Sequence, residues 1–140
     1  MKIKIFKISL VIIWMILIFC FSNQKATESS KLSDGLIKHT ISKIINDDSE
    51  KTLKKYTKPV RKCAHFCVYL ILGLLVFNCF NINKKYILYS IIICLLYSIS
   101  DEIHQIFVEG RSCELLDVII DTTGASIGTL INYKSRNKLK

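Results

Sequence analysis

Four long apolar segments constrain this chain more than any other feature. They cover residues 5–21, 64–80, 86–107 and 115–133, and the charged residues gather between them. About twenty apolar residues in a helix cross the roughly 30 Å hydrocarbon core of a bilayer. An apolar content of 51% would also fit a soluble protein, so it is the segregation of polar from apolar residues that indicates a membrane protein. We therefore predict an all-α fold, an integral membrane bundle of four transmembrane helices that forms one domain over residues 1–140.

The region between the first two segments is long and polar. Six apolar residues recur within it at helical spacing: Leu32, Leu36, Ile37, Ile41, Ile44 and Ile45. This pattern predicts an amphipathic helix over residues 31–46, lying in the membrane interface or packed over the bundle. Further along, we expect Pro59 just before the second span or in its first turn, where a missing N–H is tolerated.

The net charge of +9 does not indicate nucleic-acid binding, because the basic residues flank the apolar segments. Such placement fits anionic lipid headgroups and orients a membrane protein. The long first loop holds ten basic residues, but short loops weigh more, and the loop between the last two spans holds only Arg111. We therefore expect a multi-pass protein with both termini in the cytoplasm, with the lipid bilayer as a partner and without a nucleic-acid partner.

Metal-binding patterns are weak in this sequence. The six cysteines include no CxxC pair, and Cys63 and Cys67 have no matching second pair for zinc. Carboxylate and imidazole ligands are offered by His65, Glu102, His104 and Asp121. However, there is no HExxH motif, and DEIHQ brings only one histidine on its helix. We predict no metal and no cofactor, with the histidines in interfacial hydrogen bonds.

Polar residues stand at one end of every span. FSNQ closes the first span, RKCAH opens the second, SDEIHQ closes the third and GRSCELLDVIID opens the fourth. Because neighbouring spans are antiparallel, these four ends meet at the same face of the membrane. Ionisable groups at that depth are costly unless they pair or meet water, so their gathering is a hypothesis for a functional site.

Helical spacing aligns these polar residues into one stripe on each span. The stripe of the third span contains Ser98, Asp101, Glu102 and Gln105, with His104 beside it. The stripe of the second span contains Arg61, His65 and Tyr69. That of the fourth contains Asp117, Asp121, Gly124 and Gly128, and the two glycines allow a neighbouring helix to approach closely. We expect the acids to point into the bundle and to pair with Arg61, Lys62 and Arg111.

These polar segments resemble the VanZ-like family. The resemblance is carried by FSNQ, RKCAHFCVYLILGLL and SISDEIHQIFVEGRSCELLDVIIDTTGASIG, and it covers nearly the whole chain. It implies a small helical protein of the bacterial cytoplasmic membrane, similar to the teicoplanin-resistance accessory protein that names the family. The matching motif positions are Arg61, Lys62, His65, Phe66, Tyr69, Asp101, Glu102, His104, Gln105, Phe107, Gly110, Arg111, Asp117, Asp121 and Gly124.

Two positions depart from the pattern of that family. Val68 stands where an acidic residue is common, and Glu109 stands where proline is common. If the missing acid accepted a proton or bound a ligand, this member would be inactive or would take a different substrate.

Three hypotheses for function follow from the polar residues and the resemblance. The first is a non-enzymatic envelope protein that lowers susceptibility to teicoplanin-type lipoglycopeptides. Its ligand, an envelope lipid or a glycopeptide-related molecule, would be bound by Arg61, Lys62, His65, Tyr69, Gln105, Arg111, Asp117 and Asp121. The second is a membrane-embedded enzyme acting on a lipid-linked or phosphorylated headgroup, with Asp101, Glu102 or His104 moving protons. The third is a structural or assembly factor whose polar residues only hold the helices together.

Overall fold

The computed structural model describes residues 2–24, 35 and 50–139 of the chain. These residues form four helices and contain no strand: α1 (Lys2–Ser22), α4 (Glu50–Asn78), α5 (Lys85–Gln105) and α6 (Leu115–Lys138). The prediction of an all-α fold is therefore confirmed for this part of the chain. Apart from residue 35, the amphipathic helix predicted over residues 31–46 lies outside the described residues.

Three of the four helices are long and apolar enough to cross a membrane: α1, α4 from Tyr56 onward, and α5. The fourth helix, α6, is not among them, since Asp117 and Asp121 lie in its first two turns and basic residues lie in its last. Hydropathy therefore supports three of the predicted transmembrane helices, and the fourth stays a prediction.

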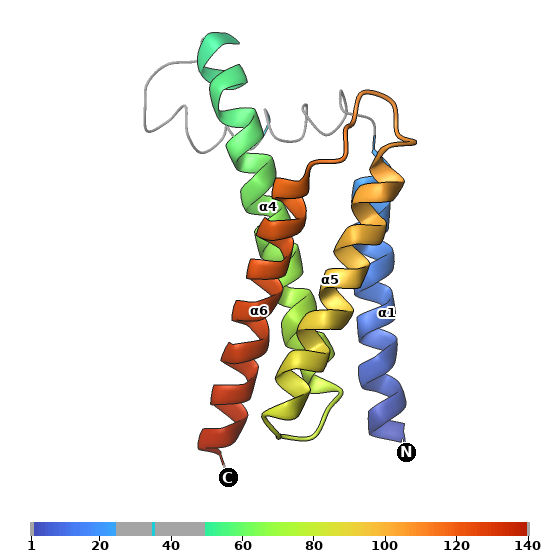
Figure 1. The fold of residues 1–140 in the computed structure, drawn as a ribbon, viewed down its shortest axis with the longest axis vertical. Coiled ribbons are helices and arrows are strands. Elements are labelled where there is room, and N and C mark those ends of the chain that lie inside the picture. The colour runs from blue at the N-terminus through green and yellow to red at the C-terminus, as the bar shows by residue number, and fades with distance from the viewer. Residues whose placement is uncertain (1, 25–34, 36–49, 140) are drawn as a thin grey trace.

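Helices that follow one another in the chain run in opposite directions, so α4 and α6, which pack together, run in the same direction (Figure 1). Both chain ends lie at one end of the bundle, together with the turn of residues 79–84 that joins α4 to α5. The loop of residues 106–114, which joins α5 to α6, lies at the opposite end. We call this opposite end the loop end. The end of α1, the end of α5 and the start of α6 all meet there.

The helix α4 begins earlier than its apolar segment. It starts at Glu50, so Pro59 lies inside the helix. The prediction that Pro59 stands before the helix or in its first turn was therefore wrong. A proline inside a helix leaves one backbone hydrogen bond unmade. The turns before Pro59 are polar and project beyond the other helices (Figure 1). Because charged and polar residues predominate in these turns, hydropathy does not mark where the helix begins.

Glycines let α4 and α6 pack with their backbones almost in contact. A Cβ atom added to Gly128 would overlap the carbonyl oxygen of Leu70, and one added to Gly73 would overlap that of Ala125. Only hydrogen fits at these positions, which is the close approach expected of small residues spaced four apart. This contact sets how near the polar residues of α4 come to those of α6.

Hydrogen bonds to backbone carbonyls attach the helix α1 to the other helices. The Trp14 indole Nε1 donates to the Val68 carbonyl oxygen of α4 at 2.9 Å. The Tyr97 hydroxyl of α5 donates to the Met15 carbonyl oxygen at 2.6 Å. Most large apolar side chains of α1 remain exposed. An apolar exterior of this kind is what a lipid environment requires.

Candidate functional site

The loop end of the bundle contains a connected group of polar side chains from α4, α5, α6 and the 106–114 loop. We call it the polar cluster; its members are Lys62, His65, Ser98, Asp101, Glu102, Gln105, Arg111, Glu114, Asp117 and Asp121. Four of its carboxylates, on Asp101, Glu102, Asp117 and Asp121, belong to residues that are at most 2% exposed. Buried ionisable groups persist only where other polar groups stabilise them.

Lys62 of α4 bridges two carboxylates at the start of α6. Its Nζ lies 2.9 Å from Glu114 Oε2 and 2.5 Å from Asp117 Oδ1. The Asp117 side chain is buried, whereas the side chains of Lys62 and Glu114 reach the surface. Hydrogen bonding to Lys62 holds the pKa of the Glu114 carboxyl below its usual range. This bridge therefore joins α4 to the start of α6 within the polar cluster.

Asp121 of α6 lies between a hydroxyl and an imidazole. The Ser98 hydroxyl donates to Asp121 Oδ2 at 2.8 Å, and His65 Nδ1 lies 3.3 Å from Asp121 Oδ1. Asp121 is fully buried, and the His65 side chain is only 14% exposed. A carboxylate beside one ring nitrogen orients an imidazole and leaves its other nitrogen available.

Glu102 of α5 is held by two donors on its two oxygens. The Gln105 amide donates to Glu102 Oε1 at 2.9 Å, and the Glu114 backbone N–H donates to Oε2 at 2.9 Å. The same amide nitrogen lies 3.4 Å from Asp101 Oδ2. The backbone of the 106–114 loop therefore helps to fix the carboxylate of α5.

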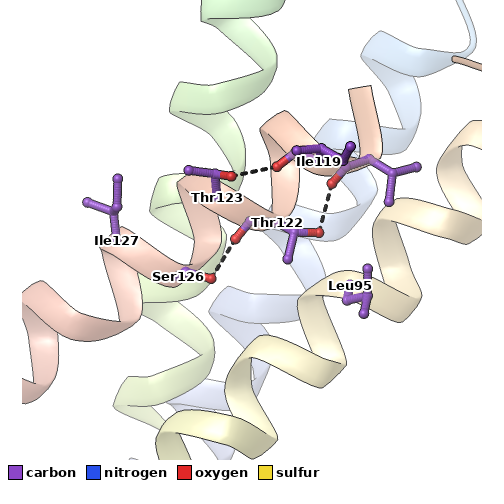
Figure 2. A pocket seen from close by; sticks show the side chains of 7 residues that line it. Leu95, Ile119, Thr122, Thr123, Ser126 and Ile127 are labelled. Atoms are coloured by element: carbon purple, nitrogen blue, oxygen red, sulfur yellow. Dashed lines mark hydrogen bonds between the residues drawn. The ribbon is translucent and has the colours of Figure 1, made fainter. Parts of the chain in front are cut away.

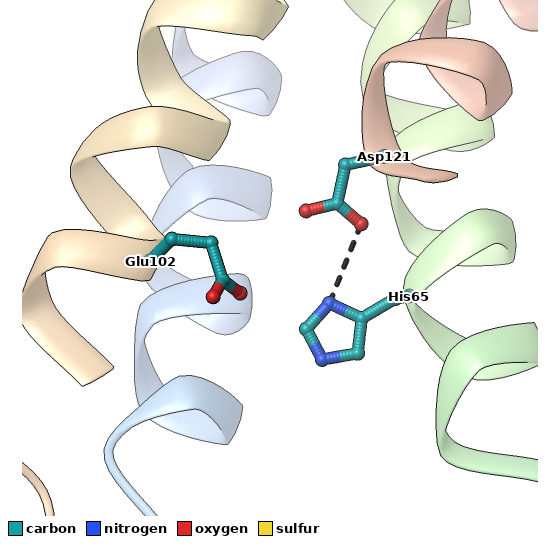
Figure 3. Close-up of side chains that lie close together, drawn as sticks. All are labelled: His65, Glu102 and Asp121. Atoms are coloured by element: carbon teal, nitrogen blue, oxygen red, sulfur yellow. Dashed lines mark ion pairs between the residues drawn. The ribbon is translucent and has the colours of Figure 1, made fainter. Parts of the chain in front are cut away.

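Figure 3 shows His65, Glu102 and Asp121 reaching toward one another from three helices. One ligand atom from each residue can be chosen so that all three lie within 4.8 Å of one another. Imidazole and carboxylate groups at this separation can share a proton, a water molecule or a cation.

Arg111 ties the loop to the end of α1. Its Nε donates to the Gln24 carbonyl oxygen at 2.9 Å and its Nη2 to that of Phe21 at 3.3 Å, while its Nη1 donates to Gln105 Oε1 at 3.2 Å. Gly110 precedes it with a φ of 76°, a left-handed conformation that favours glycine. The arginine thus links α1, α5 and the loop through one planar group.

Arg61 lies at the edge of the polar cluster, near enough to Arg111 for their charges to interact. Burial lowers the pKa of the Arg111 guanidinium, and the positive charge of Arg61 lowers it further. The buried Nε of Arg61 makes no hydrogen bond within the part of the chain that the structure describes. Two guanidinium groups whose charges act on each other, one of them with an unused donor, favour the binding of an anion.

A model of the VanZ/LLP1 family matches residues 7–135. The chain belongs to the VanZ/LLP1 family. The match includes every residue of the polar cluster and confirms the resemblance seen in the sequence. Comparisons of this family member with curated proteins and with solved structures found no match.

The structure of this VanZ/LLP1 family member brings most of the residues that were proposed for a site into one group. These are Lys62, His65, Asp101, Glu102, Gln105, Arg111, Asp117 and Asp121, with Arg61 at the edge. The fully buried Tyr69 lies four residues after His65 on α4, and its hydroxyl makes no hydrogen bond among the described residues.

His104 does not join them. Its Nε2 lies 3.4 Å from Asn23 Oδ1, and its ring lies against Phe19 with 4.5 Å between the ring centroids. The side chain therefore faces α1. Glu114, in contrast, was missed by the sequence analysis, although it directly precedes α6 and lies only three residues before Asp117.

A separate hollow of about 380 Å³ lies between α5 and α6 in this family member. It is lined by Leu95, Val118, Ile119, Thr122, Thr123, Ser126 and Ile127 (Figure 2). Its three hydroxyl groups each donate to a carbonyl of their own helix at 2.7 Å. The hollow therefore presents an almost wholly apolar wall.

Proposed function

We propose that this VanZ/LLP1 family member binds the anionic headgroup of an envelope lipid at its polar cluster, and so lowers susceptibility to teicoplanin-type lipoglycopeptides. The observation that carries the proposal is Arg61, whose buried Nε is unpartnered among the described residues and whose charge acts on Arg111. The charges of two guanidinium groups that influence each other repel, and a bound anion would relieve that repulsion and could accept a hydrogen bond from Arg61.

The apolar hollow supports a lipid as the source of that anion. Val118 and Thr122, which line the hollow, flank Asp121 of the polar cluster along α6. A lipid whose headgroup meets Arg61 and Arg111 would thus have an apolar path along α5 and α6 for an acyl chain. A soluble anion would gain nothing from that path.

We further propose a membrane arrangement in which this site lies at the outer face. We propose that α6 crosses the bacterial cytoplasmic membrane as a fourth span, because it packs along α4 through Gly124 and Gly128. Both termini then lie in the cytoplasm, as the basic residues in the first two turns of α1 and at the end of α6 favour. The loop end, with the polar cluster, faces the compartment where lipoglycopeptides act.

The test compares Arg61→Gln with Lys58→Gln, which removes an exposed cation one turn earlier on α4. Teicoplanin susceptibility is measured in a bacterial host that expresses each variant or none, and protein abundance is measured in the same cells. Binding of anionic and zwitterionic lipid vesicles to the purified proteins is measured in parallel. A hydrogen bond to a charged group contributes about 1.5–3 kcal/mol, so anionic lipid should bind Arg61→Gln about tenfold more weakly or worse. Lys58→Gln should behave like the original protein.

Each other outcome counts against the proposal in a distinct way. Susceptibility that does not change with expression removes the link to lipoglycopeptides. Loss of function in step with loss of abundance favours a structural or assembly role. Turnover of labelled lipid that stops in His65→Ala favours the enzymatic hypothesis over simple binding.

A further inference from the structure

Three buried carboxylates of the polar cluster lack a Lys or Arg partner. In the described ranges, the ion pairs of lysine and arginine with the cluster are those of Lys62, and they go to Glu114 and Asp117. Arg111 donates to Gln105 and to backbone carbonyls instead of to a carboxylate. The carboxylates of Asp101, Glu102 and Asp121 are therefore buried without a permanent cation, which is costly in an apolar medium.

Two of these carboxylates also have an oxygen with unused bonding capacity. Asp121 Oδ1 and Asp101 Oδ1 are buried atoms that accept no hydrogen bond among the described residues. Asp121 is fully buried and Asp101 is 2% exposed. His65 Nδ1, 3.3 Å from Asp121 Oδ1, is likewise a buried atom without a hydrogen bond. An Asp101 oxygen without a hydrogen bond, and an Asp121 oxygen whose neighbour is an imidazole that is charged only when protonated, indicate that further positive charge would stabilise the cluster.

The geometry of His65, Glu102 and Asp121 suits a metal ion as that group. Their ligand atoms lie within 4.8 Å of one another and come from α4, α5 and α6 (Figure 3). Ligands bound to a tetrahedral zinc ion at about 2.1 Å lie about 3.4 Å apart, so closure around an ion needs shifts of about an ångström. One imidazole and two carboxylates are a donor set used by divalent transition metals.

Surrounding groups would orient two of these ligands. The Ser98 hydroxyl holds Asp121 Oδ2, and the Gln105 amide and the Glu114 N–H hold the two oxygens of Glu102. Metal sites commonly have such hydrogen bonds behind the ligands, since these fix the direction of each ligand.

We propose that His65, Glu102 and Asp121 bind one divalent transition-metal ion inside the polar cluster, for which Zn²⁺ is the probe. The ion would supply positive charge to the buried carboxylates and join α4, α5 and α6. The motif search predicted no metal, because the three ligands lie on different helices and form no short spacing pattern. This proposal concerns the purified protein alone, so it can fail or succeed independently of teicoplanin susceptibility.

The experiment uses the full chain in detergent micelles, stripped of metal by a chelator. Exposed thiols such as Cys63 and Cys67 are blocked first, because they could bind zinc adventitiously. Equilibrium dialysis followed by elemental analysis then gives the zinc bound per chain as the free Zn²⁺ concentration is raised. The variants are Glu102→Gln and His65→Gln, and the matched control is His104→Gln, whose histidine faces α1.

We expect one zinc ion per chain in the original protein and in His104→Gln. Loss of a ligand should weaken binding at least about tenfold in Glu102→Gln and His65→Gln. Helix content and the unfolding temperature of each metal-free protein show whether a variant still folds. Zn²⁺ should raise the unfolding temperature of the proteins that bind it and leave that of the non-binding variants unchanged. Absence of zinc binding in the original protein would overturn the proposal. Equal zinc binding by folded Glu102→Gln, or loss of binding in His104→Gln, would overturn it as well.

Discussion

Three buried acids of the polar cluster are stabilised by different kinds of partner. Asp117 has the ammonium group of Lys62, Glu102 has an amide and a backbone N–H, and Asp121 has a hydroxyl and an imidazole. An ion pair fixes the charge state of both partners. A carboxylate with only neutral donors still needs a proton or a cation to neutralise its charge. The residues with neutral partners are therefore the ones at which binding can change the charge of the cluster.

Loss of the Lys62 ammonium should destabilise the protein, because Asp117 would remain buried without its cation. Removing one partner of a fully buried pair costs roughly 3 kcal/mol, and the cost should be smaller here because Lys62 reaches the surface. We expect Lys62→Met to lower the unfolding temperature in detergent, as followed by circular dichroism. Lys58→Met, which removes an exposed lysine from the same helix, should change it little.

A second change separates the lost pair from other effects of the Lys62 substitution. Adding Asp117→Asn to Lys62→Met removes the unpaired charge, so part of the lost stability should return. Equal unfolding temperatures for Lys62→Met and Lys58→Met would show that the bridge does not stabilise the fold.

Among the helices, the contact between α4 and α6 decides the geometry of the site. The glycines Gly73, Gly124 and Gly128 let the two backbones touch below the polar cluster. With the helices this close, Lys62 reaches Asp117 and His65 reaches Asp121. If the two helices were farther apart, neither pair could form. The glycines therefore position the charged residues of the polar cluster.

Gly128→Ala tests this contact, because helix propensity would raise the stability of the protein and overpacking against α4 would lower it. Alanine favours a free helix over glycine by about 1 kcal/mol. Here the added methyl group would meet the Leu70 carbonyl oxygen, and overpacking of this kind costs about 1–3 kcal/mol. We expect a lower unfolding temperature for Gly128→Ala and little change for Thr123→Ala on the exposed face of α6. A higher temperature for Gly128→Ala would mean that the helices do not touch there.

Over the whole molecule, polarity is reversed relative to a soluble protein. Large apolar side chains cover the outside of the helices, while Asp101, Glu102, Asp117 and Asp121 are buried within the bundle. This arrangement suits a bilayer, in which apolar side chains face acyl chains and charged groups are sheltered between helices. Because the polar cluster lies near one end only, the orientation of the chain decides which compartment can supply its ligand.

The orientation can be measured with a thiol reagent that does not cross membranes. Cys113 is exposed in the 106–114 loop, and Ser135 is exposed near the end of α6. With both termini in the cytoplasm, a protein retaining only Cys113 should be labelled in intact cells. A cysteine-free protein carrying Ser135→Cys should be labelled only after lysis. The reverse pattern would place the polar cluster on the cytoplasmic side and exclude a direct role against lipoglycopeptides outside the membrane.

The sequence by itself determined the helical character, the antiparallel order and the end of the bundle where polar residues gather. Hydropathy and helical spacing are properties of local sequence, so they identify apolar helices and the polar stripe on each. They failed at the start of α4, where polar turns around Pro59 continue the helix beyond its apolar part.

Only the tertiary structure decided which polar side chain meets which. His65 and His104 both stand at the polar end of a span, yet packing turns His65 toward Asp121 and His104 toward Phe19 of α1. Likewise, Lys62 and Asp117 are 55 residues apart, and Glu102 meets the backbone of Glu114 only because the loop folds back over α5. Such pairs depend on helix rotation and on the backbone contact at the glycines. Local sequence specifies neither, because both result from packing among all four helices at once.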